Sequence, residues 1–416
     1  MRTWTTPAMN DLTNDDLSAA SEAIGPQITA LRRAIHADPE LGLETPRTMA
    51  KVREALADLP LEWREGPSTT GQVAVLKGGA QREGESCRRV LLRGDMDALP
   101  MGEETGLDFA SAIPGRMHAC GHDSHTAMLF GAVRLLAERA DRLAGEVMFM
   151  FQPGEEGFGG ARLMIEDGLI EPLPDAAFAY HVIPNAPYGL FVCREGPLMA
   201  SSDAFEIVVT GRGGHASMPH HAADPLPVAC EIVTALQAMV TRRFAVADPV
   251  VVTVTQFRAS DADNVISERC TLRGTIRTLS PETREKVHAA CRDLVSGIAT
   301  AHGMKGEFLV RQGFPVTRND PRAVALAREV VTERFGSEAW HDLPDPLMTA
   351  EDFSYVLQAV PGAMVLLGAA DPDADWQRAP GLHSPHMHID ERILPRGSAL
   401  LAALAIRTLH GGLPAG

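Results

Sequence analysis

Residues 90–100 read VLLRGDMDALP, a short apolar run followed at once by two aspartates, Asp95 and Asp97. The run predicts a buried strand, and residues 72–76, 146–151 and 176–180 share its apolar texture. Helical patterns at residues 124–139 and 161–167 separate the last three of these strands. Strands alternating with helices predict an α/β domain with a mainly parallel sheet. Because open α/β sheets bind ligands at the carboxyl ends of their strands, both aspartates are expected at such an edge.

Other predicted strands also end in metal-binding side chains. The strand VMFMF leads into Glu155 and Glu156, and His181 directly follows AAFAY. Adjacent carboxylates diverge, so one glutamate can bind an ion while the other remains free as a base. Strand ends that each carry Asp, Glu or His converge on one rim, which predicts a single site.

Two histidine-rich segments add to this rim. MHACGHDSH at 117–125 precedes a helix, and its central glycine, Gly121, lets the loop bend Cys120 and His122 toward one ion. LHSPHMHID at 382–390 supplies further imidazoles. One thiolate, several imidazoles and a carboxylate exceed a single tetrahedral shell and therefore predict two ions. Zinc, cobalt, nickel and manganese all fit this donor set.

The texture changes near residue 200, where strands with solvent-facing positions begin. A strand, helix, strand, strand, helix, strand order predicts an inserted antiparallel α+β domain. The expected boundaries are 1–199 and 313–416 for a discontinuous catalytic domain, and 200–312 for the insertion. In the insertion, GRGGHASMPH at 211–220 presents His215, which fits either a tight hairpin or a donor to a substrate oxygen. Asn264 and Arg277 are candidate amide and carboxylate-binding groups.

Composition excludes several classes of partner. The chain has 416 residues, 45% apolar and 22% charged, with a net charge of −16, as expected of a globular protein that repels polyanions. We therefore expect no nucleic-acid or membrane partner. No run approaches the ~18 apolar residues of a membrane helix, and the first residues do not read as a secretion signal. These features predict a cytoplasmic protein.

The motifs together resemble a known enzyme family. DMDALP at 95–100, MHACGHDSHTA at 117–127, FQPGEEGFGGA at 151–161, GRGGHASMPH at 211–220, TAEDFS at 349–354 and LHSPHMHID at 382–390 are similar to motifs of the dinuclear-metal amidohydrolases. That family includes hippurate hydrolase, N-acyl-amino-acid aminoacylases and auxin-conjugate hydrolases. The resemblance runs in collinear order through nearly the whole chain. In related peptidases of the superfamily, a histidine takes the place of Asp95.

The resemblance implies specific roles for site residues. It implies that two divalent ions, manganese, zinc, cobalt or nickel, are bound by Cys120, His122, Glu156, His181 and His383, with Cys120 shared between them. Glu155 is implied as the general base, and Asp97 as the carboxylate that steadies the site. His215 corresponds to a histidine that stabilises the oxyanion from a ferredoxin-like lid and dimerisation domain, in several relatives from the partner subunit. Asn264 and Arg277 correspond to contacts with the substrate carbonyl and carboxylate.

The expected activity is metal-dependent hydrolysis of the amide bond of small N-acyl amino acids, by a homodimer or higher homo-oligomer. This reaction releases a carboxylic acid and a free amino acid. Two alternatives remain open at the level of sequence. Cys120 could act as a nucleophile with His118 or His122, giving a cysteine hydrolase. The chain could also be a non-catalytic protein that binds metal or peptide.

Overall fold

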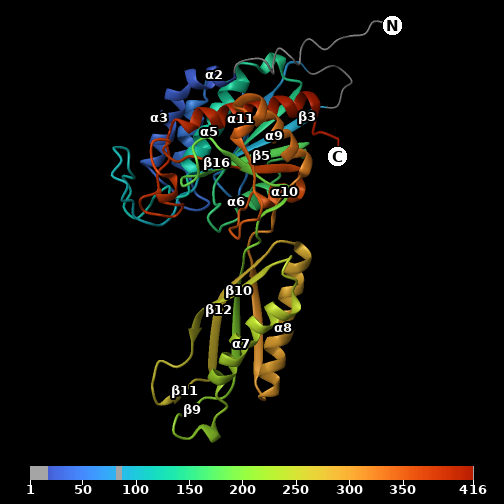
Figure 1. Cartoon of the computed structure of the whole chain (residues 1–416). Coiled ribbons are helices and arrows are strands. Elements are labelled where there is room, and N and C mark those ends of the chain that lie inside the picture. Colours follow the sequence, from blue (N-terminus) through green and yellow to red (C-terminus); the bar gives the residue numbers. More distant parts are fainter. Residues whose placement is uncertain (1–16, 81–86, 416) are drawn as a thin grey trace. The chain divides into compact units, whose positions relative to one another are not determined.

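A computed structural model describes residues 17–80 and 87–415 of the chain, which form two compact units (Figure 1). Unit 1 comprises Met1–Gly196, Arg318–Pro344 and Asp352–Gly416, and unit 2 comprises Pro197–Thr317 and Asp345–Glu351. The chain passes between the units within β7 (Gly196–Met199), within β14 (Thr317–Asn319), and again on either side of Asp345–Glu351. The first sixteen residues of the expected catalytic domain lie outside the described part.

Unit 1 is built on a sheet of eight strands with the order β1-β2-β4-β3-β5-β16-β6-β15. These strands are β1 (Glu62–Glu65), β2 (Gln72–Lys77), β3 (Arg88–Asp95), β4 (Gly145–Gln152), β5 (Ala176–Ile183), β6 (Phe191–Cys193), β15 (Trp340–Asp342) and β16 (Gly362–Gly368). The neighbours β4, β3, β5 and β16 run parallel, as do β6 and β15. Among these central strands, β4, β3 and β5 end next to the candidate site residues.

The sheet is mixed, with parallel pairing at its centre, which confirms the expected α/β domain in part. Antiparallel pairing joins β1 to β2, β2 to β4, and β16 to β6. The connection between β1 and β2 spans only residues 66–71. A parallel crossover needs a dozen or more residues, so a connection of this length requires the antiparallel arrangement.

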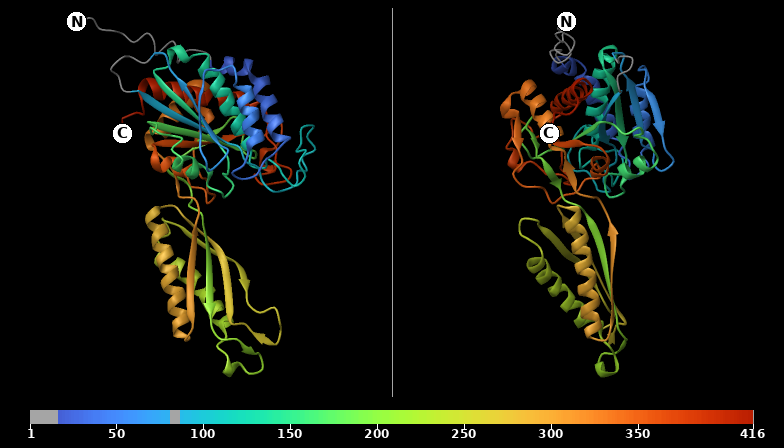
Figure 2. Two further views of the ribbon diagram at one scale, coloured as in Figure 1. Left: turned by 180° about the vertical axis from the view of Figure 1, so that it is seen from behind. Right: turned by 90° about the vertical axis from the view of Figure 1, so that its right-hand side faces the viewer.

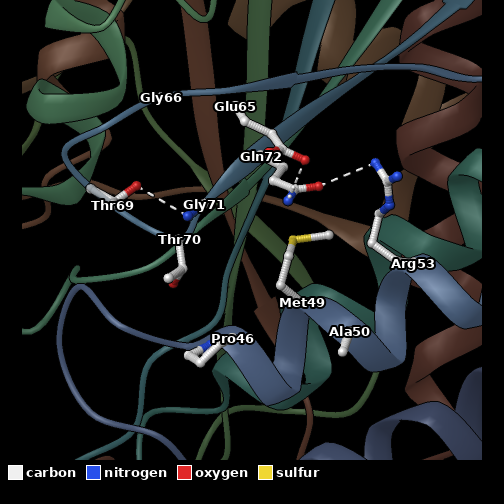
Figure 3. Close-up of a pocket in the computed structure, with 10 residues that line it drawn as sticks. All are labelled: Pro46, Met49, Ala50, Arg53, Glu65, Gly66, Thr69, Thr70, Gly71 and Gln72. Atoms are coloured by element: carbon white, nitrogen blue, oxygen red, sulfur yellow. Dashed lines mark hydrogen bonds between the residues drawn. The ribbon is translucent and has the colours of Figure 1, made fainter.

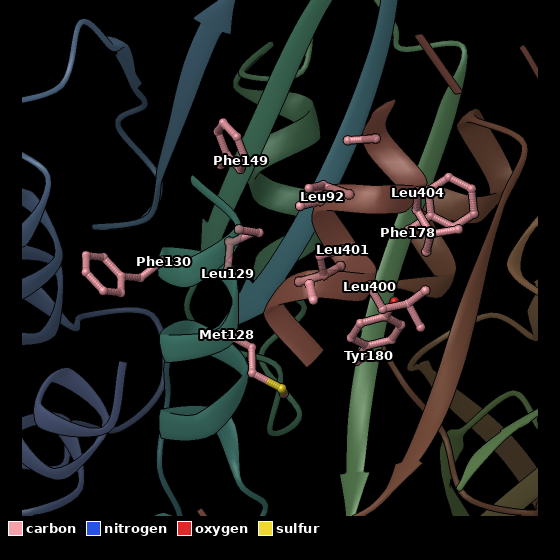
Figure 4. Close-up of a cluster of buried hydrophobic side chains, with 14 of the residues drawn as sticks. Leu92, Met128, Leu129, Phe130, Phe149, Phe178, Tyr180, Leu400, Leu401 and Leu404 are labelled. Carbon is pink, nitrogen blue, oxygen red and sulfur yellow. The ribbon is translucent and has the colours of Figure 1, made fainter. Parts of the chain in front are cut away.

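Two buried helices, α5 (His122–Ala137) and α11 (Ile393–Gly411), pack against each other and against the sheet. Almost every residue of both is buried, as expected for helices that are apolar on most of their surface. Figure 4 shows part of this core, formed by Met128, Leu129, Leu400, Leu401, Leu404, Phe149 and Phe178. The remaining helices of unit 1 are α2 (Leu17–Ala23), α3 (Gly25–His36), α4 (Pro46–Ala55), α6 (Gly160–Glu166), α9 (Pro321–Phe335) and α10 (Ser354–Ala359).

Unit 2 has its own antiparallel sheet and its own core. Its four strands follow the order β10-β12-β8-β13, and its elements are β8 (Asp203–Thr210), β9 (Gly214–His215), α7 (Pro225–Arg243), β10 (Val250–Arg258), β11 (Val265–Ile266), β12 (Arg269–Thr278), α8 (Pro281–Ala301) and β13 (Lys305–Gln312). Burial alternates along β8, so one face of this sheet packs beneath α7 and α8 (Figure 2). Within the described ranges, no helix is long and apolar enough to cross a membrane.

Candidate metal centre

Three neighbouring parallel strands of unit 1 deliver the candidate ligands to one edge of the sheet. Asp95 is the last residue of β3, Glu155 and Glu156 follow β4, and His181 lies near the end of β5. The order β4-β3-β5 places these three ends side by side. The geometry therefore follows from strand direction, because parallel neighbours end at the same edge.

The loop before α5 adds Cys120 and His122 to this edge. Gly121 between them has a φ of 84°, in the left-handed region that favours glycine. A Cβ atom at Gly121 would also lie 2.4 Å from Cγ2 of Val182 on β5. The tight turn and the close approach both require glycine here, and they let the side chains of Cys120 and His122 face the same space.

The structure groups the predicted ligands into two overlapping sets. Cys120, His122 and His181 form one set, and Cys120, Glu156 and His383 form the other. Within each set, the donor atoms lie within 4.8 Å of one another. Cys120 is common to both, so the donors can hold two cations with a bridging ligand.

Hydrogen bonds orient both buried imidazoles toward this space. His122 Nδ1 lies 2.8 Å from the carbonyl oxygen of Asp97, and His181 Nδ1 lies 2.8 Å from that of Val182. A carbonyl only accepts, so Nδ1 carries the proton in each ring and Nε2 faces the candidate site. His122 Nε2 is buried and makes no hydrogen bond within the described residues. A divalent cation would satisfy this nitrogen, so the donor set fits a metal.

The electrostatics of the site also favour a cation. Burial lowers the pKa of His122, yet the charge of Asp95 and the hydrogen bond with Asp97 help to outweigh it and leave this pKa well above its usual value. Burial, reinforced by the nearby His125 ring, lowers the pKa of His181 to about 3, so this imidazole is neutral. Burial raises the pKa of the Cys120 thiol, which a bound cation would reverse by stabilising the thiolate.

Asp97 fixes the two glutamates through their backbone. Its Oδ1 accepts the N–H of Glu155 at 2.9 Å, and its Oδ2 accepts the N–H of Glu156 at 3.1 Å. Gly154 and Gly157 flank the pair with φ values of 74° and 86°, which turns the chain sharply on either side. Asp97 therefore acts on the loop that carries both carboxylates.

His383 is held in an uncommon backbone conformation. Its φ is 63°, and among the described residues no other non-glycine residue has a positive φ. A backbone conformation of this kind costs on the order of 1–3 kcal/mol. Its N–H donates to the carbonyl of Ala119 at 2.8 Å, which ties the C-terminal loop to the loop of Cys120. His383 Nε2 lies 3.4 Å from Oε1 of Glu156. This backbone conformation places the His383 imidazole beside Glu156, another candidate ligand.

The comparison with known proteins is consistent with this geometry. Residues 91–407 match the profile of peptidase family M20/M25/M40. The chain belongs to this family. Its membership, together with hydrolase relatives, confirms the expectation of a metal-dependent amidohydrolase.

Relatives of this M20/M25/M40 protein carry different activities in their names. It is 36% identical to N-acetylcysteine deacetylase of Bacillus subtilis, over 94% of this chain and 99% of the relative. It is also 36% identical to IAA-amino acid hydrolase ILR1-like 4 of Arabidopsis thaliana, over 92% and 86% of the two chains. A dinuclear metal-binding peptidase of family M20 from Bacillus subtilis has a similar structure, with a TM-score of 0.79, 33% identity and coverage of 94% and 99%.

The candidate residues of unit 2 in this M20/M25/M40 chain do not all lie together. His215 in β9 pairs with Val265 in β11, and the carbonyl of Asn264 accepts the N–H of Ala216 at 3.0 Å. Arg277 lies eight residues beyond Arg269, the start of β12, or about 26 Å along the strand. The structure therefore brings His215 close to Asn264. Arg277 lies near the end of β12 that is far from the β9–β11 pair.

A separate hollow of about 400 Å³ in unit 1 contains none of the predicted site residues (Figure 3). It lies between α4 and the start of β2, and its polar side chains bond to one another. Arg53 donates to Gln72 at 3.3 Å, Gln72 donates to Glu65 at 3.0 Å, and Thr69 accepts the N–H of Gly71 at 3.0 Å. We assign no role to this hollow.

Several buried polar groups behind the donor sets have no role predicted from the sequence. These are Arg93, Gln152, Asp352 and His125, which are joined by hydrogen bonds to one another or to Asp95. His125 and Asp352 fall inside the motifs MHACGHDSH and TAEDFS, and this position was the only feature of the sequence that pointed to a role at the site. Arg93 offered none, because a buried arginine in a strand reads like an exposed one.

Proposed function

We propose that this enzyme hydrolyses the amide bond of N-acyl amino acids and releases a carboxylic acid and a free amino acid. Two divalent cations, manganese, zinc, cobalt or nickel, would be held by Cys120, His122, Glu156, His181 and His383. The observation that carries the proposal is the pair of donor sets that share Cys120, next to a glutamate that belongs to neither set. The dinuclear peptidase of similar structure supports the number of ions.

When bound, such cations act as Lewis acids toward the amide carbonyl and the attacking water. Glu155 accepts the proton that this water loses as its oxygen bonds to the acyl carbon. Glu155 then returns the proton to the amide nitrogen as the carbon–nitrogen bond breaks. Asp97 serves this transfer by holding the Glu155 backbone at a fixed position.

In this proposal, unit 2 provides the remaining contacts with the substrate. His215 donates a hydrogen bond to the oxygen that becomes negative in the transition state, aided by Asn264 at the carbonyl. Arg277 pairs with the free carboxylate of the amino acid. The amide and carboxylate of an N-acyl amino acid are only a few bonds apart, whereas Arg277 lies near the end of β12 that is far from the two-stranded β9–β11 pair. This separation supports a homodimer in which His215 serves the active site of the partner subunit.

The relatives support the class of substrate that we propose. N-acetylcysteine deacetylase, IAA-amino acid hydrolase and thermostable carboxypeptidase 2 of Saccharolobus solfataricus are each 36% identical to this chain. Their names differ in the acyl group, so we carry over only the class of N-acyl amino acids. A free carboxylate is the feature that our assignment of Arg277 requires.

The test is a hydrolysis screen with the full-length protein. Chelator-treated enzyme is reloaded with manganese, zinc, cobalt or nickel and offered N-acetyl, N-benzoyl and indoleacetyl amino acids, their methyl esters and dipeptides. We expect release of free amino acid to depend on metal and kcat/KM to fall for the esters. Full activity after chelation, or cleavage of dipeptides alone, would contradict the proposal.

A further inference from the structure

The Asp95 carboxylate lies among the candidate ligands, but both of its oxygens already have partners. Oδ1 lies 2.6 Å from Nδ1 of His125, and Oδ2 lies 2.5 Å from Nη1 of Arg93. The side chains of Asp95 and Arg93 are completely buried. The carboxylate is therefore fixed on two sides by groups of the protein itself.

His125 connects Asp95 to the backbone of β5. The N–H of Val182 donates to His125 Nε2 at 2.9 Å. Because a backbone amide can only donate, Nε2 carries no proton and Nδ1 must carry it. His125 thus donates to Asp95 at one end and accepts from Val182 at the other, which fixes both its tautomer and its orientation.

Val182 completes a path to His181, a proposed ligand. The Val182 carbonyl accepts the Nδ1 proton of His181 at 2.8 Å, while the Val182 amide is bound to His125. The rings of His125 and His181 are also in edge contact, with centroids 4.8 Å apart. Hydrogen bonds therefore run from Asp95 through His125 and Val182 to the ring of His181.

Arg93 balances the charge at the start of this path. Its Nη2 donates to Asp352 at 2.9 Å and its Nε donates to Gln152 at 2.8 Å. Asp352 also accepts the N–H of Ala161 at 3.0 Å, so its own position is fixed. A buried carboxylate needs a paired cation, and Arg93 is that cation for Asp95, although Arg93 is shared with the second buried carboxylate of Asp352.

We propose that Asp95 and His125 are positioning residues that orient His181 for metal binding, and that Asp95 is not itself a ligand. The proposal rests on the ligand set of the proposed function. The competing assignment makes Asp95 a ligand, since Asp95, His122 and His125 have donor atoms within 4.8 Å of one another, and Asp95 Oδ2 lies 3.6 Å from Nε2 of His122. The two assignments predict different numbers of bound ions and different behaviour of paired substitutions.

The experiment titrates the metal-free, full-length protein with Co²⁺ in the absence of substrate. It compares wild type, Asp95→Asn, His125→Phe and the double variant by stoichiometry, affinity and the sulfur-to-cobalt charge-transfer band from Cys120. We expect each variant to bind two equivalents and keep the band, with affinity about 10–100-fold weaker at one site. The double variant should be no weaker than His125→Phe alone, because both residues act along one path.

Three results would overturn the proposal: loss of one cobalt equivalent in Asp95→Asn, additive losses in the double variant, or unchanged affinity in His125→Phe. His125→Asn, which cannot span from Asp95 to Val182, replaces His125→Phe if that variant does not fold. Asp320→Asn, at the N-terminus of α9, is the matched carboxylate control and should bind like wild type. No substrate enters the measurement, so a failure to hydrolyse N-acyl amino acids would leave this result standing.

Discussion

Glu155 and Glu156 are neighbours in sequence, yet their side chains meet different groups. Glu156 Oε1 lies 3.4 Å from His383 Nε2, while Glu155 Oε2 lies 4.0 Å from His122 Nε2. Asp97 holds the backbone of both, and each glutamate has a carboxylate oxygen within 4.8 Å of a ring nitrogen of His122. One carboxylate can therefore bind an ion while the other handles a proton.

This division predicts the behaviour of Glu155→Gln. The amide keeps the size of the side chain but cannot accept a proton, so kcat should fall about 10²–10⁴-fold. Cobalt stoichiometry should stay at two equivalents, because Glu155 is not a proposed ligand. Glu166→Gln on the exposed end of α6 is the control and should retain wild-type kcat. A Glu155→Gln enzyme with near-normal kcat would remove Glu155 as the base.

Sequence alone reached the candidate ligands and Asp97, but not the other groups that hold the ligands. Cys120, His122 and His181 could be placed together because they follow strands or a glycine turn that end at one edge. The partners of Arg93 and His125 could not be predicted, because they depend on side-chain directions across the sheet. Periodicity states which face a residue occupies, not which atom it contacts.

Among the elements, α3 is attached to the first turn of α5 by buried charges. Arg32 Nε and His36 Nδ1 each lie 2.7 Å from Oδ2 of Asp123, which directly follows His122. On its other side, His36 Nε2 lies 3.1 Å from Oε1 of Glu103. These contacts anchor the turn that carries a proposed ligand.

Glu103 should make the stability of unit 1 depend on pH. Burial raises its pKa, but bonds from His36, Thr105 and the N–H of Ser111 outweigh it and lower this pKa to about 2. A lowered folded-state pKa gives stability that is present above the unfolded value, near 4.5, and is lost as pH falls toward 2. Glu103→Gln should therefore lower the free energy of unfolding by about 1.5–3 kcal/mol at pH 5 and by little at pH 2.

Urea unfolding of wild type and Glu103→Gln at pH 2, 3.5, 5 and 6 measures this difference. Glu104→Gln, the adjacent exposed carboxylate, is the control and should show no such pH dependence. Burial lowers the pKa of His36, but Asp123 and Glu103 outweigh burial and raise this pKa overall. The stability that His36 contributes is therefore lost as pH rises through its raised pKa. An equal loss in Glu103→Gln at pH 2 and pH 5 would contradict the assignment.

The prediction of elements succeeded where the pattern was long. Residues 124–139 and 161–167 were expected to be helical, and α5 and α6 match them within two residues at each end. The short strands β1, β6 and β15 were not predicted, because three or four residues are too few to show a period. Strand direction was also beyond reach, so the antiparallel pairs of the large sheet were not predicted.

At the scale of the whole molecule, the two units have separate hydrophobic cores. One core joins α5, α11 and the large sheet, and the other joins α7, α8 and the four-stranded sheet. All proposed metal ligands belong to unit 1. Metal binding should therefore stabilise unit 1 directly and leave unit 2 largely unaffected.

The aromatic residues offer a way to observe unit 1 alone. All four tryptophans and all three tyrosines of the sequence lie outside Pro197–Thr317 and Asp345–Glu351, the bounds of unit 2. Tryptophan fluorescence therefore reports unfolding of unit 1, whereas calorimetry reports both units. The contrast comes from the natural sequence, so no probe has to be introduced.

Removal of metal should lower the melting temperature seen by fluorescence and leave a second calorimetric transition in place. At a free metal concentration 100 times Kd, each ion adds about 2.7 kcal/mol, so two ions together correspond to a shift on the order of 10 °C. His122→Ala should keep a smaller metal-dependent shift, because it lacks a ligand of one proposed ion while the set of Cys120, Glu156 and His383 remains. A single transition that moves as a whole would show that the two cores unfold together. A metal-dependent transition that is absent from fluorescence would place the metal in unit 2, against the ligand set derived from β3, β4 and β5.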